Sequence, residues 1–118
     1  MTRPHVMIAP NGARRGKSDH PALPVTITET VKVAVACHAA GADALHLHVR
    51  DETGAHSLDT ARYRDALAAL QDRLPEMAVQ ITTESGGRFA GTIASAASFF
   101  YGFRQSRFCG YCRNESGF

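Results

Sequence analysis

The amino-acid sequence predicts an α/β fold in which strands and helices alternate and the strands pair in parallel. Short apolar runs of strand length occupy residues 5–9, 44–49 and 77–82. The segments between them, 26–40 and 60–74, repeat their apolar residues every three or four positions, which is typical of helices packed on one side. Strands separated by single helices pair in parallel through right-handed crossovers. Both an open doubly wound sheet and a closed (β/α)8 barrel are built from this unit.

Length and composition indicate a small globular protein. The chain has 118 residues, of which 44% are hydrophobic and 20% charged, values that suit one packed domain. The net charge of +2 is too small to indicate nucleic acid or a membrane surface as a partner. No apolar run approaches the ~18 residues of a membrane span, and no signal peptide is visible. The odd number of cysteines, three, favours a reducing compartment, so we expect a cytoplasmic protein.

Capping signals define both predicted helices. Thr26 and Glu29 have the spacing of a capping box, and Gly41 follows the first helix as a stop signal. Ser57 and Asp59 are candidate N-caps of the second helix. The expected core-facing residues are Ile27, Val31, Val35 and Ala39 in the first helix, and Tyr63, Leu67, Leu70 and Leu74 in the second.

The loop after the first strand, residues 10–24, is longer than the ~2–6 residues usual between a strand and a helix. Its length indicates a functional or mobile loop. It lacks the G-x-G-x-x-G turn of a dinucleotide-binding fold. In both parallel architectures, ligands bind at the C-terminal ends of the strands, which here are residues 11–12, 48–51 and 82–87.

The most informative motif is His46-Leu47-His48 in the second strand. Side chains alternate along a strand, so the two histidines share one face while Leu45, Leu47 and Val49 share the other. Two imidazoles spaced by ~6.5–7 Å along a strand can share a metal ion, which we expect to be Zn²⁺. The motif alone also allows two hydrogen-bonded core histidines, or a strand whose histidine face meets water.

Several segments together resemble the β-keto acid cleavage enzyme family over about residues 5–88. They are residues 10–13, 19–26, 40–51 with its H-L-H-V-R-D string, and 80–87 with Gln80-Ile81-Thr82-Thr83 and Gly86-Gly87. The resemblance implies that the chain forms the first three β/α units of a (β/α)8 TIM-type barrel. It also implies an acyl-transferring enzyme of carbon–carbon bond cleavage, in which a β-keto acid and acetyl-CoA give acetoacetate and a new CoA thioester. Family enzymes of this kind are expected to be homo-oligomeric.

The resemblance implies roles for individual residues. His46 and His48 match the two zinc-ligand histidines of the family, whose third ligand is a glutamate on a late strand that this chain does not contain. Arg14 lies in the loop that selects the substrate, where a cation would suit an anionic substrate tail; an ordinary solvated arginine is the alternative. The expected substrate-contacting residues of the third strand and its loop are Thr82, Ser85 and Gly86. No catalytic residue is assigned.

The composition changes near Arg88. We therefore divide the chain into residues 1–88, the N-terminal part of a barrel, and residues 89–118, a tail of aberrant composition. All phenylalanines and tyrosines except Tyr63 lie in the tail, and residues 89–103 carry no charge. The tail fits three interpretations: an apolar helix that caps the sheet, a C-x-x-C site at Cys109 and Cys112, or the product of a frameshift, which we favour.

The leading functional hypothesis is therefore a truncated zinc-dependent β-keto acid cleavage enzyme, inactive as this chain. A three-stranded remnant leaves sheet edges unpaired and lacks the third zinc ligand. The first alternative is a small metal-binding α/β module that holds an ion through His46 and His48 and engages a partner through its aromatic tail. The second alternative is a thiol–redox protein that uses Cys109 and Cys112.

Overall fold

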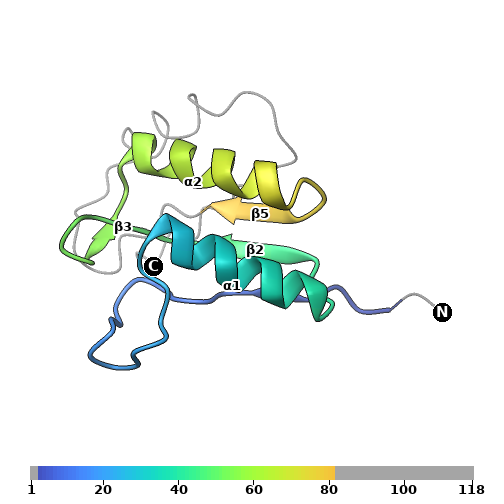
Figure 1. Ribbon diagram of the computed structural model, residues 1–118, viewed down its shortest axis with the longest axis horizontal. Coiled ribbons are helices and arrows are strands. Elements are labelled where there is room, and N and C mark those ends of the chain that lie inside the picture. Colours follow the sequence, from blue (N-terminus) through green and yellow to red (C-terminus); the bar gives the residue numbers. More distant parts are fainter. Residues whose placement is uncertain (1–2, 82–118) are drawn as a thin grey trace, which may run out of the picture.

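The computed structural model describes residues 3–81. In this part of the chain, two helices cover a sheet of three parallel strands, and a short antiparallel pair lies beside it. The elements are β1 (Met7–Ile8), α1 (Ile27–Ala39), β2 (Ala44–Leu47), β3 (Val49–Arg50), β4 (His56–Ser57), α2 (Thr60–Arg73) and β5 (Ala78–Ile81). The sheet order is β1-β2-β5, with β2 in the centre, and both helices lie on one face and contact each other (Figure 1). The predicted α/β fold with parallel strands is confirmed. The closed barrel stays an inference from the family.

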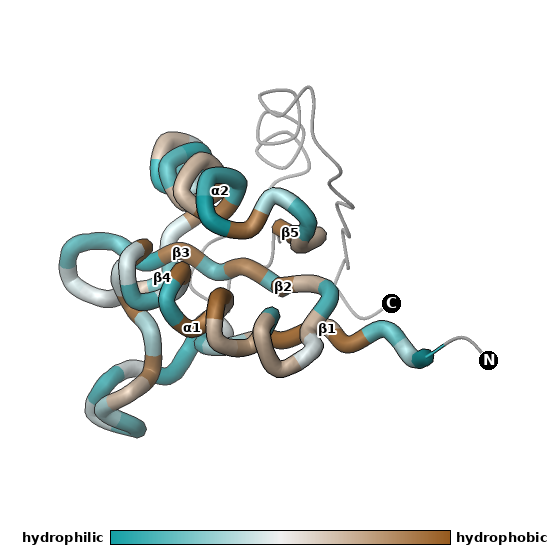
Figure 2. Tube along the Cα trace, turned by 45° about the vertical axis from the view of Figure 1, so that its right-hand side comes forward, coloured by the Kyte–Doolittle hydropathy of each residue, from teal (hydrophilic) through white to brown (hydrophobic). Residues whose placement is uncertain are grey.

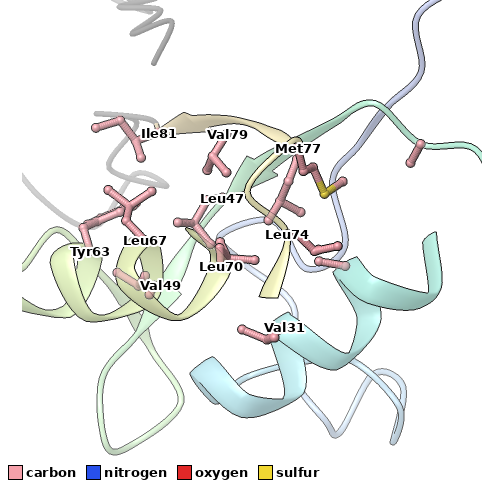
Figure 3. Packing of buried hydrophobic residues seen from close by; sticks show 14 residues of the cluster. Val31, Leu47, Val49, Tyr63, Leu67, Leu70, Leu74, Met77, Val79 and Ile81 are labelled. Atoms are coloured by element: carbon pink, nitrogen blue, oxygen red, sulfur yellow. The ribbon is translucent and has the colours of Figure 1, made fainter. Parts of the chain in front are cut away.

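The register of β2 and β5 decides which side chains meet the helices. Leu45 pairs with Val79, and Leu47 pairs with Ile81. Since these four residues are buried together with the apolar side chains of α1 and α2, the sheet packs one apolar face against the helix layer (Figure 3). The core residues on the helices and the chain next to them include Val31, Ala34, Tyr63, Ala66, Leu67, Leu70, Leu74 and Met77.

The start of α1 agrees with the predicted capping box. The Glu29 N–H donates to Oγ1 of Thr26 over 3.2 Å, and the Thr26 N–H donates to the Glu29 carboxylate over 3.1 Å. A third donor, the N–H of Val25, and the ammonium of Lys17 also contact that carboxylate, at 2.8 and 2.9 Å. The hydrogen bond from Val25, followed by the contact with Lys17, lowers the pKa of Glu29 to about 2. At the other end, Gly41 takes a φ of 110°, as expected for a glycine after a helix.

The core-facing side of α1 differs in part from the predicted one. Val31 is buried, and Ile27 and Val35 pack partly against the core, but Ala39 is exposed. The other buried residues are Thr30 and Ala34, which the predicted spacing omitted. A strict spacing of four drifts by about 40° per step around a helix of 3.6 residues per turn, so the fourth member of the series has left the buried side.

Helix α2 matches its prediction closely. Of the two candidate N-caps, Asp59 is the one used, because its carboxylate accepts from the N–H groups of Ala61 and Arg62 at 2.7 and 3.3 Å. Ser57 instead lies in β4. All four predicted core residues are buried: Tyr63, Leu67, Leu70 and Leu74. Neither helix within residues 3–81 has the length and apolar character needed to cross a membrane.

The predicted strand 44–49 is interrupted. β2 ends at Leu47, and Val49–Arg50 leave the parallel sheet to form β3, which pairs antiparallel with β4. A tight turn joins β3 to β4: the Asp51 carboxylate accepts from the N–H groups of Thr53 and Ala55, and Gly54 takes a φ of 84°. This short hairpin was not predicted, because two-residue strands carry no readable periodicity.

The first strand is shorter than predicted. Only Met7 and Ile8 pair with β2, while Val6 and Met7 remain 46% and 52% exposed. Within the described sheet, β1 has a strand neighbour on one side only, so one row of its backbone groups forms no ladder there. The loop that follows, between β1 and α1, extends away from the sheet and is largely hydrophilic (Figure 2).

Candidate functional site

The two histidines of the motif lie side by side at the carboxyl end of β2. Their ring centroids are 4.9 Å apart. Their neighbours Leu45, Leu47 and Val49 are buried in the apolar core, which places the imidazoles on the face of the sheet opposite the helices. The predicted alternation is therefore confirmed, although β2 formally ends one residue before His48.

His46 has a polar partner on the neighbouring strand. The register pairs His46 with Gln80, and Nδ1 of His46 lies 2.6 Å from Oε1 of Gln80. This contact leaves Nε2 as the ring nitrogen of His46 that is not engaged by Gln80. Gln80 belongs to one of the segments that resemble the family, residues 80–87, but the sequence predicted no role for it.

His48 is almost fully buried, with 4% of its surface exposed. Burial, followed by the nearby charges of His46, His56 and Arg50, lowers the pKa of His48 from 6.5 to about 3. The imidazole is therefore neutral at physiological pH. Its Nδ1 atom makes no hydrogen bond to any group in residues 3–81. A neutral imidazole with a buried, uncommitted nitrogen has the character of a metal ligand.

A third imidazole lies next to this pair. His56, in β4, is 1% exposed, and its ring centroid is 5.1 Å from that of His48. Sequence reasoning missed this neighbour because it did not predict the β3–β4 hairpin. The only signal available was the turn-forming run Asp51 to Gly54, which can bring the following residues back along the strand.

The two motif histidines have the donor chemistry that a zinc ion requires. Imidazole nitrogens suit zinc, and the neutral His48 ring meets that requirement. Across residues 3–81, however, no set of three or more His, Cys, Asp or Glu side chains is placed to hold a metal ion. Within this part of the chain, His46 and His48 are two neighbouring nitrogen donors with no third such ligand placed beside them.

A buried arginine ties the neighbouring loops to this end of the sheet. The Arg50 guanidinium donates to the carbonyls of Asn11, Gly12 and Gly54 at 3.2, 2.8 and 2.9 Å. Burial lowers the pKa of Arg50 from its ordinary value. The Asn11 side-chain amide donates to the carbonyl of His48 over 3.2 Å and to that of Pro24 over 3.1 Å. These contacts join the loop after β1 to the strand end that carries His48.

Of the other predicted site residues, only Arg14 lies in the part of the chain that the structure describes. Arg14 is exposed in the loop between β1 and α1, a few residues after the segment that Arg50 holds. Thr82, Ser85 and Gly86 lie outside the described residues, as do Cys109 and Cys112. The structure thus brings His46 and His48 together and leaves the remaining assignments as predictions.

A hollow of about 300 Å³ lies at the same end of the sheet, between α1 and α2. Apolar side chains such as Val31, Leu47 and Leu70 line most of it, and Arg62 and Glu52 contribute polar groups. His48 lines it, whereas His46 and Gln80 do not, so the hollow lies beside His48 and apart from the His46–Gln80 contact.

The fold and site define an α/β protein with a histidine pair at the carboxyl end of a central parallel strand. The chain belongs to the β-keto acid cleavage enzyme family: the model of the family described as "beta-keto acid cleavage enzyme" matches residues 5–103. The predicted family is confirmed. The resemblance was predicted to end at about residue 88, but the matched range continues to residue 103.

Named relatives support this membership. The chain is 35% identical over 72 residues to a 3-keto-5-aminohexanoate cleavage enzyme of Fusobacterium nucleatum, covering 61% of the chain and 26% of that protein. It is 35% identical over 89 residues to a 3-oxoadipate:acetyl-CoA acetyltransferase of Cupriavidus necator, covering 75% of the chain and 31% of that protein. A 3-keto-5-aminohexanoate cleavage enzyme of Acetoanaerobium sticklandii is 32% identical over 72 residues, covering 61% and 26%. The chain thus spans about a quarter to a third of the length of these relatives.

Proposed function

We propose that this chain carries the metal-binding strand of a zinc-dependent β-keto acid cleavage enzyme. The reaction joins a β-keto acid and acetyl-CoA and yields acetoacetate and a new CoA thioester. The single observation that carries the proposal is the His46–His48 pair, whose rings lie 4.9 Å apart on the face of the sheet opposite the helices. Family membership supports it, since the family is defined by β-keto acid cleavage.

The chain's own residues would contribute binding and orientation. A zinc ion held by His46, His48 and the glutamate implied by the family resemblance would act as a Lewis acid toward the keto oxygen. Gln80 fixes the His46 ring from the neighbouring strand. Asn11 and Arg50 hold the loop after β1 against the strand end, which places the start of that loop beside His48.

The proposed substrate is a β-keto acid with an anionic tail. Arg14 supplies a cation in the loop after β1, and Thr82, Ser85 and Gly86 are the proposed contacts from the segment after β5. The Cupriavidus necator relative is named for 3-oxoadipate, a dicarboxylate, which agrees with a cation at this position. The same name supports acetyl-CoA as the second substrate.

Zinc titration of the 118-residue chain tests this proposal. With a coloured chelator as competitor, we expect one zinc ion per chain and at least about tenfold weaker binding in His46→Ala and in His48→Ala. His38→Ala is the matched control, because His38 lies on α1 away from the pair and contacts the carbonyl of Ala42. Wild-type zinc affinity in His46→Ala would contradict the proposal.

We further propose that the 118-residue chain is inactive by itself. It spans about a quarter to a third of its relatives, and among residues 3–81 no third side chain joins His46 and His48 as a metal ligand. Incubation of the purified chain with zinc, 3-oxoadipate and acetyl-CoA is expected to give no acetoacetate above a no-protein blank. Turnover that is lost in His48→Ala would contradict this part of the proposal while supporting the reaction.

The DNA sequence tests the proposed origin of segment 89–118. Because the family match continues to residue 103, the DNA is searched from the Arg88 codon onward; a shifted reading frame there that encodes further strand–helix units supports a frameshift within a longer barrel gene. A DNA sequence without such units in any frame contradicts the frameshift and favours the alternative of a small metal-binding module.

A further inference from the structure

We propose that Gln80 is a positioning residue that selects the tautomer of His46. Its side-chain carbonyl accepts a hydrogen from Nδ1 of His46, so that Nε2 keeps its lone pair for a ligand. The part of this inference that concerns metal rests on the proposed function. The part that concerns the tautomer stands on the contact itself, at 2.6 Å.

The strand register brings the two side chains together. His46 of β2 pairs directly with Gln80 of β5. The residues on either side of Gln80, Val79 and Ile81, are 7% and 1% exposed and pack in the core beneath the helices. Gln80 therefore projects from the opposite face, the one that carries His46. Neighbouring strands lie ~4.8 Å apart, a separation that two side chains on the same face bridge easily.

The orientation of the Gln80 amide determines which ring nitrogen of His46 carries the hydrogen. A neutral imidazole carries one N–H, and the other nitrogen keeps a lone pair. If the amide oxygen of Gln80 faces Nδ1, the hydrogen is on Nδ1 and Nε2 is free to bind a metal. If the amide nitrogen faced Nδ1, Nδ1 would have to accept, the hydrogen would move to Nε2, and the metal-binding nitrogen would be lost.

Metal-binding histidines usually donate their second N–H to an oxygen acceptor, which holds the ring in place and raises its basicity. His46 has such an acceptor in Gln80. Nδ1 of His48, by contrast, has no hydrogen-bond partner within residues 3–81. We therefore expect the orientation of His46 to depend on a side chain and that of His48 to depend on burial.

Nuclear magnetic resonance reads the tautomer directly. Long-range ¹H–¹⁵N spectra of the zinc-free chain, recorded well above the ordinary imidazole pKa of ~6.5, distinguish a ring protonated on Nδ1 from one protonated on Nε2. The chain supplies both references. Nδ1 of His38 lies 2.9 Å from the carbonyl of Ala42 and must carry the hydrogen, whereas Nδ1 of His20 accepts from the N–H of Ala22 over 3.1 Å.

We expect the His46 signals to follow the His38 pattern. A His46 pattern like that of His20 would overturn the inference, whatever the zinc affinity of the chain. This outcome is independent of metal, so it separates a failure of the Gln80 role from a failure of the proposed function. An Nδ1-protonated His46 in a chain that does not bind zinc would overturn the metal site and leave the tautomer assignment standing.

Three variants complete the test. Gln80→Leu removes the acceptor and is expected to populate both tautomers of His46 and to weaken zinc binding by about 10- to 100-fold. Gln80→Glu keeps an acceptor that cannot donate, so we expect the Nδ1-protonated pattern and zinc binding at least as tight as in the wild type. Gln71→Leu is the matched control on the exposed surface of α2 and is expected to change neither readout.

The variants also distinguish a specific role of Gln80 from a general loss of folding. If Gln80→Leu fails to fold, Gln80→Glu decides the question, because an Nε2-protonated His46 in that variant would overturn the inference. If Gln80→Leu folds and retains both the wild-type tautomer and the wild-type zinc affinity, the inference is likewise overturned.

Discussion

The two faces of the central strand β2 differ in what holds their side chains in place. On the helix face, Leu45 and Leu47 are almost fully buried among the apolar side chains of α1, α2 and β5. On the other face, the His46 side chain depends on its contact with Gln80, and the His48 side chain depends on burial. One face of this strand thus stabilises the fold, and the other carries the two histidines proposed as metal ligands.

Typical free energies of burial and of hydrogen bonding indicate how much each face stabilises the fold. Burying a leucine side chain contributes ~1.5–3 kcal/mol, whereas a typical hydrogen bond contributes a net ~0.5–1.5 kcal/mol. The helix face therefore dominates the free energy of unfolding. The histidine face adds less stability, but the hydrogen bond between His46 and Gln80 has direction, so it sets the orientation of the His46 ring, whereas the His48 ring depends on burial.

The largest effect is expected from truncation of the helix face. Leu47→Ala leaves a cavity among tightly packed side chains and should lower the free energy of unfolding by about 2–5 kcal/mol, measured by urea denaturation. The adjacent change His46→Ala is the control and should lower it by less than about 1 kcal/mol while weakening zinc binding. Equal losses of stability in the two variants would break the contrast between the faces.

A smaller loss is expected where the loops join the strand end. Arg50→Ala removes the donor that serves the carbonyls of Asn11, Gly12 and Gly54, and should lower the free energy of unfolding by about 2–3 kcal/mol. Arg64→Ala, on the exposed side of α2, is the control and should have little effect. Since the loop start would be released from the strand, we also expect faster amide hydrogen exchange within the loop at Asp19, whose N–H donates to the carbonyl of Gly16 over 2.9 Å. Unchanged exchange in a folded Arg50→Ala variant would argue against the clamp.

The smallest effect concerns the start of α1, at the edge of the helix layer. The pKa of Glu29 is lowered to about 2, so its carboxylate stabilises the fold above its ordinary value of 4.5. That stabilisation is lost as the pH falls from about 4.5 to about 2. Glu29→Gln should flatten this part of the stability curve, because the neutral amide can still cap the helix but does not titrate. A wild-type slope between these pH values in Glu29→Gln would assign the effect to other carboxyl groups, such as Asp43.

Local signals predicted the helices well and the short strands poorly. The capping box at Thr26 and Glu29 and the N-cap at Asp59 depend on neighbouring backbone groups, so the sequence pattern suffices to find them. Ala39 was placed on the buried side of α1 and is exposed, because a spacing of four drifts around the helix. The β3–β4 hairpin escaped prediction because each of its strands has two residues.

The candidate site was predicted only in part for a related reason. His46 and His48 lie two positions apart in one strand, so alternation alone shows that they share a face. Gln80 and His56 are distant in sequence, and their contacts with the pair depend on the register of β5 and on the β3–β4 hairpin. Neither of these can be read from periodicity.

The sequence by itself determined the α/β class, the ends of the helices, the shared face of the two histidines and, through its motifs, the family. These features depend on residues within a few positions of one another or on short strings. Only the tertiary structure decided that Gln80 faces His46, that His56 lies beside His48 and that Arg50 holds the loop after β1. The physical reason is that these contacts join side chains whose separation is set by strand pairing and loop packing rather than by the spacing of residues along the chain.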